Sequence, residues 1–310
     1  MKHRYIVLIM TEPFVDTETD RTKSRWVAEA LRDFGRPRTT VRALFYFAMR
    51  RGVSDYPICG KLVGEIRICR PYTEGDGERL PKWVSRARKL GFIPEDAILD
   101  ETPEEQVFLP GTSSNDETKP RIEVWVNKSS LNQLILPVCT NHEATLVSVS
   151  SKPSRAAVEN LCQRSDRLTI ILCLSDLSVG TFSFCRDLAT AIADAKSAEG
   201  KDIRVKRIGL TPKQVFDLAI PMVQGEQGSK EDRKMYETYI KPYEFSRKRM
   251  AELDALEAYH LGGLAKFVEE ALSRYEDNSK LDEATWLLNL KKGVLPAETN
   301  IDSVEIAQPT

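Results

Sequence analysis

The chain has 310 residues and lacks the motifs that most directly reveal a function. It contains no G-x-x-x-x-G-K-[ST] phosphate loop, no G-x-G-x-x-G turn, no H-E-x-x-H and no G-x-S-x-G. We therefore expect no nucleotide cofactor. Histidine occurs at only three positions, which gives little material for a histidine-based triad or metal centre. No apolar run approaches the roughly 20 residues of a membrane span, so we expect no membrane partner.

The six cysteines form neither a C-x-x-C pair nor a Cys/His zinc spacing. Several lie in apolar runs, such as residues 171–174, where a free thiol behaves as a small hydrophobic side chain. Unpaired thiols persist in reducing compartments. We therefore expect a cytoplasmic protein.

The net charge of −1 conceals a strong asymmetry along the chain. Residues 21–91 contain 17 Lys and Arg against 7 Asp and Glu, whereas residues 92–118 contain 8 acids and no Lys or Arg. A basic block of this kind is typical of a phosphate-binding surface. An ordinary solvated helical surface explains the charge equally well.

Residues 1–92 are predicted to form a basic helical domain. A strand is expected over residues 5–10, and helices over residues 21–34, 40–51, 58–69 and 81–90, with Thr39 or Thr40 capping the second helix. Short helices with outward basic side chains suit a helix-turn-helix or winged-helix DNA-binding module. A small helical bundle without nucleic acid is the alternative. Candidate DNA contacts are Arg36, Arg38, Arg50, Arg51, Lys82, Arg86, Arg88, Lys89 and, further along the chain, Lys128.

Residues 93–120 are acidic and rich in proline, and they are predicted to form a linker. After them, strands and helices alternate through residues 121–228, which indicates an α/β fold with a mainly parallel sheet covered on both faces. Residues 229–292 are predicted to be a charged helical segment and residues 293–310 a tail. The strands are expected at residues 121–126, 145–149, 168–174 and 203–210.

Polar residues follow two of these strands, at the sheet edge where α/β proteins place their ligands. Asp176 follows the most apolar strand, and Asn127 follows the first strand of the sheet. Glu123 shares a strand face with Asn127 by the period of two. Oxygen ligands of this kind suit Mg²⁺. The alternative for Asp176 is a helix-capping or turn acid.

Four segments, taken in order, resemble a known family. They read EVWVNKSSL (123–131), LSDLSVG (174–180), LTPKQVFDLAIP (210–221) and ELDAL (252–256). Together they are similar to phage and mobile-element proteins that carry a Toprim domain related to the A subunit of topoisomerase VI. The resemblance covers roughly residues 36–275. In addition, TTVRALFYFAMRRG (39–52) is similar to the helix on which this family carries its nucleophilic Tyr, four residues after an Arg, and the matching pair here is Arg42 and Tyr46.

The resemblance implies Mg²⁺ chemistry with an incomplete ligand set. Toprim domains hold the metal with a strand-end Glu and a D-x-D pair, and here the matching positions are Asn127 and Asp176-Leu177-Ser178. Two of the three acids are missing, at Asn127 and Ser178. The implied protein is therefore a homodimeric DNA-binding relative whose catalysis is reduced or lost.

Two other interpretations stay open at this point. One is an active Mg²⁺-dependent strand-breaking enzyme or nuclease, in which Tyr46 attacks DNA while Asp176 and Glu123 hold the metal. The other is a non-catalytic scaffold subunit that binds a protein partner. Tyr46 also has a structural interpretation, because an aromatic residue in an apolar helix is often a core residue. Glu252 and Asp254 of ELDAL could bind metal, cap a turn or lie on a solvated helix face, and we expect a structural role.

Overall fold

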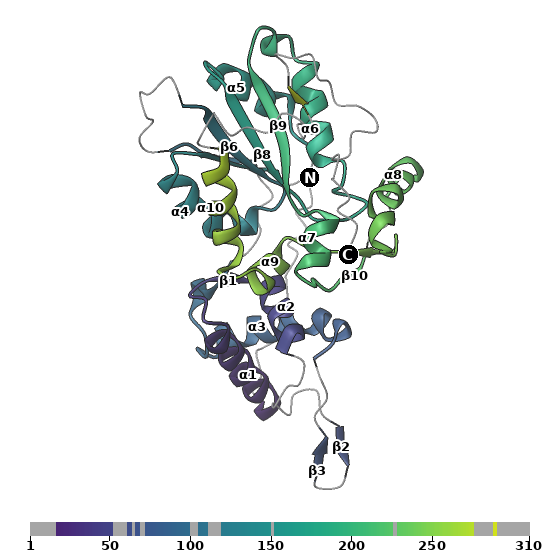
Figure 1. The fold of residues 1–310 in the computed structure, drawn as a ribbon. Coiled ribbons are helices and arrows are strands. Elements are labelled where there is room, and N and C mark those ends of the chain that lie inside the picture. The colour runs from purple at the N-terminus through teal and green to yellow at the C-terminus, as the bar shows by residue number, and fades with distance from the viewer. Residues whose placement is uncertain are drawn as a thin grey trace, which may run out of the picture.

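The structure is a computed structural model that describes residues 17–51, 61–63, 66–68, 72–99, 105–110, 119–149, 152–225, 228–275 and 288–289. The strand expected at residues 5–10 and the tail at residues 293–310 lie outside this part. Figure 1 shows a helical N-terminal module below a twisted sheet that carries helices on both faces. In the described part of the chain, none of the helices combines the length and the apolar character that crossing a membrane requires.

The N-terminal module begins with two helices that the sequence predicted. Helix α1 (Glu18–Phe34) is capped by Thr17, whose side chain accepts a hydrogen bond from the Asp20 amide, and it ends at Gly35 in a left-handed conformation. Helix α2 (Val41–Arg51) starts at Thr40, whose Oγ1 accepts a hydrogen bond from the Ala43 amide at 3.0 Å. The predicted Thr cap is thereby confirmed.

The predicted helix over residues 58–69 is wrong where the structure describes it. Strands β2 (Lys61–Val63) and β3 (Ile66–Ile68) pair antiparallel as a short hairpin. Two residues, Gly64 and Glu65, separate the strands, and β-branched residues flank them. This pattern is a hairpin signal that outweighs the helical spacing of so short a segment.

The module closes with a turn and a third helix. The 3-10 turn η1 (Glu74–Arg79) leads into α3 (Leu80–Lys89), which has Pro81 in its first turn. This helix confirms the one predicted at residues 81–90. It packs against α1 through an aromatic cluster, in which the rings of Tyr72 and Trp83 lie 5.5 Å and 5.7 Å from the ring of Trp26.

The central sheet contains six described strands in the order β12-β9-β8-β6-β7-β5. The four inner strands run parallel and match the predicted segments. They are β6 (Arg121–Val126), β7 (Thr145–Ser148), β8 (Thr169–Leu174) and β9 (Ile203–Gly209). The edge strands β5 (Gln106–Phe108) and β12 (Leu288–Asn289) pair antiparallel. The predicted α/β class with a mainly parallel sheet is therefore confirmed.

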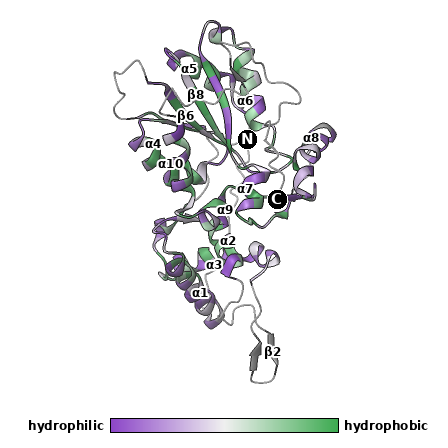
Figure 2. Cartoon of the chain, in the orientation of Figure 1, coloured by the Kyte–Doolittle hydropathy of each residue, from purple (hydrophilic) through white to green (hydrophobic). Residues whose placement is uncertain are grey.

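Helices bury both faces of this sheet. On one face, α5 (Arg155–Arg164) and α6 (Phe184–Ala193) contribute Leu161 and Leu188 to a core that includes Trp125. On the other face, α4 (Asn132–Asn141) and α10 (Gly263–Tyr275) pack together over the alternate residues of β6. Burial on both faces explains why β8 reads as a nearly unbroken apolar run, and Figure 2 shows this strand in green.

Two segments of the predicted linker at residues 93–120 are strands. After the turn η2 (Glu95–Ala97), β4 (Ile98–Leu99) pairs in parallel with β1 (Thr39–Thr40), and β5 pairs with β7. The acidic and proline-rich composition of this region hid these short pairings, because each strand has only two or three residues. Part of the predicted linker therefore belongs to the module and to the sheet.

The chain after β9 returns to the junction between module and sheet. The remaining elements are α7 (Pro212–Asp217), β10 (Val223–Gln224), α8 (Lys230–Ile240), η5 (Lys241–Tyr243), β11 (Arg249–Met250) and α9 (Asp254–Tyr259), with η3 (Ser129–Leu131) and η4 (Lys196–Ala198) earlier in the sheet domain. Helix α9 contacts both α2 of the module and α10 of the sheet domain. The predicted charged helical segment is thus integrated into the fold. Helix α9 lies between the N-terminal module and the sheet domain (Figure 1).

Candidate functional site

The strand order defines where a ligand site is expected. From β6 the chain crosses to β7 on one side, and it then returns to β8 and β9 on the other side of β6. The direction of winding therefore reverses between β6 and β8. In open α/β sheets, ligand sites form outside the carboxyl ends of the strands at this switch point.

Charged side chains from four distant segments meet at this point. Lys128 follows β6 and Asp176 follows β8, whereas Arg42 and Tyr46 project from α2. The fourth segment is residues 252–257, directly before and within α9. We call the set Arg42, Tyr46, Lys128, Asp176, Glu252 and Asp254 the junction cluster. The structure thus brings together four residues singled out from the sequence and two acids of the ELDAL segment.

Lys128 lies among the carboxylates of the junction cluster. Its Nζ is 2.5 Å from Asp254 Oδ2 and 3.9 Å from Glu252 Oε1. Its side chain is 12 % exposed, and that of Asp254 is fully buried. Burial alone lowers the pKa of Lys128, but the charges of Asp254, Asp176 and Glu252 outweigh burial and hold this pKa above its usual value. The ammonium is therefore a fixed cation. Lys128 was predicted to contact DNA, and in the structure it faces inward.

Asp176 is buried beside this ammonium. Its Oδ1 accepts a hydrogen bond from the Leu253 amide at 2.8 Å. Burial raises the pKa of Asp176 to about 6, and the negative charges of Glu252 and Asp254 add to that rise. Lys128 and the Leu253 amide oppose it. Asp176 therefore carries its negative charge at neutral pH at a cost to the folded state.

This cost gives a pH-dependent prediction for Asp176→Asn. Because the pKa is raised on folding, the carboxylate reduces stability above the folded pKa, and the penalty disappears as the pH falls below the unfolded value of about 4. We expect the variant to exceed the wild type by about 2–3 kcal/mol in unfolding free energy at pH 8 and to equal it near pH 4. Urea denaturation at pH 4, 6 and 8 measures this difference. Equal differences at all three pH values would contradict it, and Asp194→Asn on the exposed end of α6 is the control.

Tyr46 is completely buried, in agreement with its structural interpretation. Its hydroxyl donates a hydrogen bond to Glu252 Oε2 at 3.0 Å, and its ring packs edge-on against Phe45 at 5.1 Å. Burial, followed by the charge of Glu252, raises the pKa of Tyr46 above its ordinary value. A hydroxyl that donates to a carboxylate has the geometry of a nucleophile and its base. In this environment, however, the phenolate form is disfavoured.

Arg42 completes the contact between α2 and Glu252. Its Nε lies 2.6 Å from Glu252 Oε2, and its guanidinium stacks 4.4 Å from the centre of the Phe45 ring. Burial alone lowers the pKa of Arg42, but Glu252 outweighs burial and the net direction is upward. One carboxylate therefore binds both residues that the family resemblance singled out as catalytic.

The segment from Glu252 to Ala258 joins the N-terminal module to the sheet. Glu257 Oε1 pairs with Arg36 at 2.9 Å, and its Oε2 accepts from the Leu264 amide at 2.7 Å. Asp254 Oδ1 accepts from the Thr40 hydroxyl, and the Ala258 carbonyl accepts from Arg50. The ELDAL segment therefore has a structural role, as the sequence interpretation held. Sequence reasoning missed Glu257, although its position among apolar residues was a sign of burial.

Glu123, the second predicted metal ligand, does not reach the junction cluster. Both of its oxygens accept from Arg164, at 2.9 Å and 3.1 Å, and Oε2 also accepts from Trp125 Nε1 at 2.9 Å. Glu123 is paired with Ile171, five residues before Asp176, which is roughly 16 Å along the strand. Its carboxylate is satisfied on the α5 face of the sheet, so it cannot share a metal with Asp176.

The remaining predicted metal positions contribute few donors. The Ser178 hydroxyl is bonded to the Thr181 hydroxyl at 2.8 Å and accepts from the Thr181 amide. Asn127 Oδ1 is a buried oxygen with no hydrogen-bond partner in the described part of the chain. Among the described residues, no group of three His, Cys, Asp or Glu side chains has a metal-binding arrangement.

The donor set does not fit a divalent cation. A hard cation such as Mg²⁺ is held by carboxylates and other oxygens that surround it. In the junction cluster, the Lys128 ammonium already lies against Asp254, and Arg42 and Tyr46 bind Glu252. Placing Mg²⁺ among these carboxylates would set it against two fixed positive charges. We therefore derive no metal-dependent step from this site.

Most of the predicted DNA-contacting arginines make contacts within the chain. Arg36 and Arg50 bind the segment 252–258, whereas Arg38 pairs with Asp96 at 2.8 Å. Arg51 pairs with Asp33, and Arg88 donates to the Ile98 carbonyl. Arg38, Arg50 and Arg51 stay exposed although they make these contacts, and on α3 Lys82 and Lys89 are exposed while Arg86 is half-buried.

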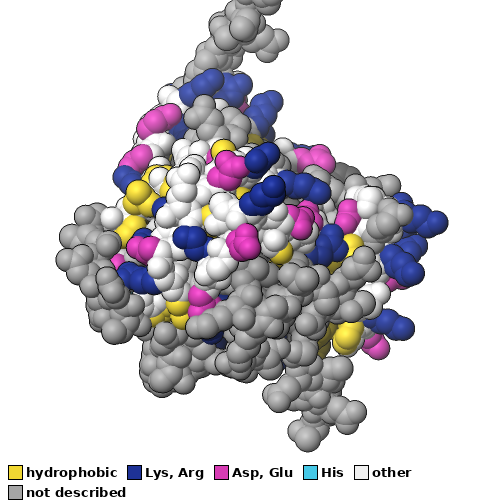
Figure 3. Space-filling view, turned by 90° about the horizontal axis from the view of Figure 1, so that it is seen from above, with side chains coloured by type: hydrophobic (Ala, Val, Ile, Leu, Met, Phe, Trp, Pro, Cys, Tyr) yellow, Lys and Arg dark blue, Asp and Glu magenta, His cyan; other side chains and the backbone are white. Residues whose placement is uncertain are grey.

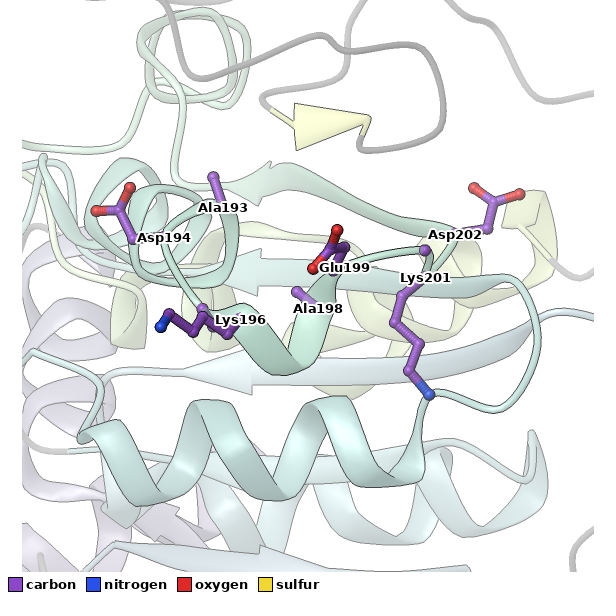
Figure 4. Close-up of a pocket in the computed structure, with 9 residues that line it drawn as sticks. Ala193, Asp194, Lys196, Ala198, Glu199, Lys201 and Asp202 are labelled. Atoms are coloured by element: carbon purple, nitrogen blue, oxygen red, sulfur yellow. The ribbon is translucent and has the colours of Figure 1, made fainter.

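A shallow pocket of about 680 Å³ lies at the opposite end of the sheet, near the amino ends of the strands. Figure 4 shows its lining, which includes Lys196, Glu199 and Lys201. In the view from above in Figure 3, the described Lys and Arg side chains lie among Asp and Glu side chains rather than in a patch of one sign. Neither the position of the pocket at the amino ends of the strands nor the mixed charge of its lining indicates a ligand.

The fold and the cluster define an α/β protein with a winding reversal at its central strands and a helical module attached there by partly buried ion pairs. Comparison with known proteins adds no family to this description. No protein-family model matches the chain, and no curated protein matches it either.

Proposed function

We propose that this protein binds duplex DNA through the outward face of α3, as a relative of topoisomerase VI A subunits whose catalysis is reduced or lost. The observation that carries the proposal is the charge of α3. Its ten residues include four Lys and Arg and no Asp or Glu. A short basic helix with one face buried and one face exposed suits contact with DNA phosphates.

The basic side chains of α3 share one side of the helix. Lys82, Arg86 and Lys89 follow the i, i+4, i+7 spacing, while Trp83, Val84 and Ala87 face the core of the module. These three cations form the surface that we call the α3 face.

Loss of catalysis is supported by the junction cluster. The hydroxyl of Tyr46 is buried, and its pKa is raised, so it is a poor nucleophile. The Lys128 ammonium lies against the carboxylates that a metal would need. In this proposal, internal contacts occupy both the nucleophilic tyrosine and the metal-binding carboxylates that the related enzymes need.

The α3 face is tested with the double variant Lys82→Ala/Lys89→Ala. We expect it to weaken binding to duplexes of any sequence and to make the slope of log affinity against log salt less steep by about 2, because two phosphate contacts are lost. Fluorescence anisotropy with a labelled duplex at several salt concentrations measures both quantities. The matched control is Lys152→Ala/Arg155→Ala, which removes the same charge from exposed positions on and before α5. Equal losses in the two double variants would contradict the proposal.

One observation favours the competing function, an enzyme that breaks DNA strands. The hydrogen bond between Tyr46 and Glu252 joins a potential nucleophile to a base, with Arg42 beside them to receive a phosphate. Incubation of supercoiled plasmid with Mg²⁺ or Mn²⁺ decides between the two functions. We expect no cleavage. Cleavage that leaves protein attached to the DNA ends, and that Tyr46→Phe abolishes, would overturn the proposal.

If the wild type neither binds nor cleaves DNA, the scaffold function with a protein partner becomes the better explanation. The homodimer implied by the family resemblance belongs to the same proposal, and light scattering of the purified protein measures it.

A further inference from the structure

Three neighbouring aromatic rings, which we call the stack, belong neither to the junction cluster nor to the α3 face. The rings of Phe216 and Tyr243 are tilted by 52° to each other. Phe216 on α7 lies 6.0 Å from the ring of Tyr243 in η5, and Tyr243 lies 5.8 Å from the ring of Phe245. The last two rings are within 25° of parallel. Phe245 packs against the main hydrophobic core and anchors the inner end of the stack.

The outer end of this stack is open to solvent. Phe216 is 63 % exposed, and it is the aromatic member of the few large hydrophobic side chains exposed in the described part of the chain. Tyr243 is partly exposed as well. The exposed ring of Phe216 contributes little to the stability of the fold, and its open face is available to a ligand that stacks on it.

The segment that carries Tyr243 and Phe245 is basic, although Arg247 and Arg249 pair with Glu237 and Glu74. Residues 241–249 contain four Lys and Arg and a single acid, Glu244. Lys241 and Lys248 are exposed, and within the described residues neither forms an ion pair. Two exposed cations therefore lie within a few positions of Tyr243 and Phe245 in the chain, available to an anionic ligand.

From this arrangement we infer that the Phe216–Tyr243–Phe245 surface binds single-stranded nucleic acid, with bases stacked on the rings and phosphates near Lys241 and Lys248. Aromatic side chains beside a basic surface are the combination by which proteins hold unpaired strands without sequence preference. A duplex offers no exposed base faces, so it cannot use the rings. This function is separate from duplex binding by the α3 face and does not depend on it.

The test compares oligo(dT), oligo(rU) and a duplex of equal length by fluorescence anisotropy. We expect the wild type to bind the single strands and Phe216→Ala to weaken that binding about 5- to 100-fold, the range found when a stacked aromatic residue is removed. Duplex affinity should stay unchanged. Phe216→Trp should keep the affinity, and its indole fluorescence should be quenched when the oligonucleotide binds. The two oligonucleotides distinguish DNA from RNA as the preferred strand.

Two controls keep the inference falsifiable. Leu261→Ala removes another exposed apolar side chain, 92 % exposed in the loop before α10, and should leave all affinities unchanged. Lys82→Ala/Lys89→Ala should weaken duplex binding and spare oligo(dT). The inference is overturned if the wild type does not bind single strands, or if Phe216→Ala binds them as well as the wild type does. An equal loss for single strands and duplex would also overturn it.

Discussion

Lys128→Met is expected to lower the free energy of unfolding by about 3–5 kcal/mol, a large share of the stability of a typical domain. The substitution keeps the length of the side chain but removes the ammonium, which leaves Asp254 fully buried without its positive partner. Breaking one side of a buried ion pair costs more than the pair contributes, because the remaining charge has lost its hydration. Urea denaturation at neutral pH measures the effect.

The same variant tests whether Lys128 takes the place of a metal. Adding Mg²⁺ or Mn²⁺ should stabilise Lys128→Met more than the wild type, because the carboxylates of Asp254 and Asp176 then lack the Lys128 ammonium, while Arg42 still binds Glu252. The double variant Lys128→Met/Asp254→Asn should recover most of the lost stability, since it removes both charges. Strong stabilisation of the wild type by millimolar Mg²⁺ would show that our interpretation of the donor set is wrong.

Arg164→Met, on the face of the sheet that α5 covers, is also expected to lower the free energy of unfolding by about 3–5 kcal/mol. Glu123 is fully buried and receives two hydrogen bonds from Arg164, so its carboxylate is left with the Trp125 indole alone. Equilibrium urea denaturation is again the measurement. Unlike the Lys128 variant, this one should gain no stability from divalent cations.

The matched control is Arg164→Met/Glu123→Gln. A neutral amide keeps an acceptor for the Trp125 indole and carries no charge, so the double variant should be more stable than the single one. A single variant as stable as the wild type would mean that the Glu123–Arg164 pair does not hold the sheet to α5. Rescue of the single variant by Mg²⁺ would restore Glu123 as a metal ligand.

Much of the sheet could be predicted because its strands are apolar on both faces and are separated by amphipathic helices. The rule that ligand sites follow parallel strands also located Lys128 and Asp176, which lie after β6 and β8. It did not reveal their roles. Lys128 looked like a surface cation because the acids that enclose it, Glu252 and Asp254, come more than 120 positions later in the chain.

Other features depended on tertiary contacts that no local pattern contains. The alternation of side chains along a strand correctly assigned Glu123 to one face of β6. It could not show that Arg164 of α5 covers that face. The outward arginines of α2 were predicted from helical spacing, yet α9 packs on that side and takes up Arg42 and Arg50. Local sequence thus predicted the helix that carries these arginines. Their partners belong to the segment 252–258, which no local pattern places beside α2.

The ion pairs between the module and the segment 252–258 have a consequence for how the protein responds to salt. Mobile ions screen charges in water over about 8–10 Å but reach buried pairs poorly. In the pairs Arg36–Glu257 and Arg42–Glu252, the carboxylate side chains are 5 % and 11 % exposed, and the arginine side chains are 30 % and 34 % exposed. High ionic strength should therefore weaken the proposed nucleic-acid binding at exposed cations more than it weakens these partly buried ion pairs. Salt titration of the proposed binding then reports mainly on the ligand contacts.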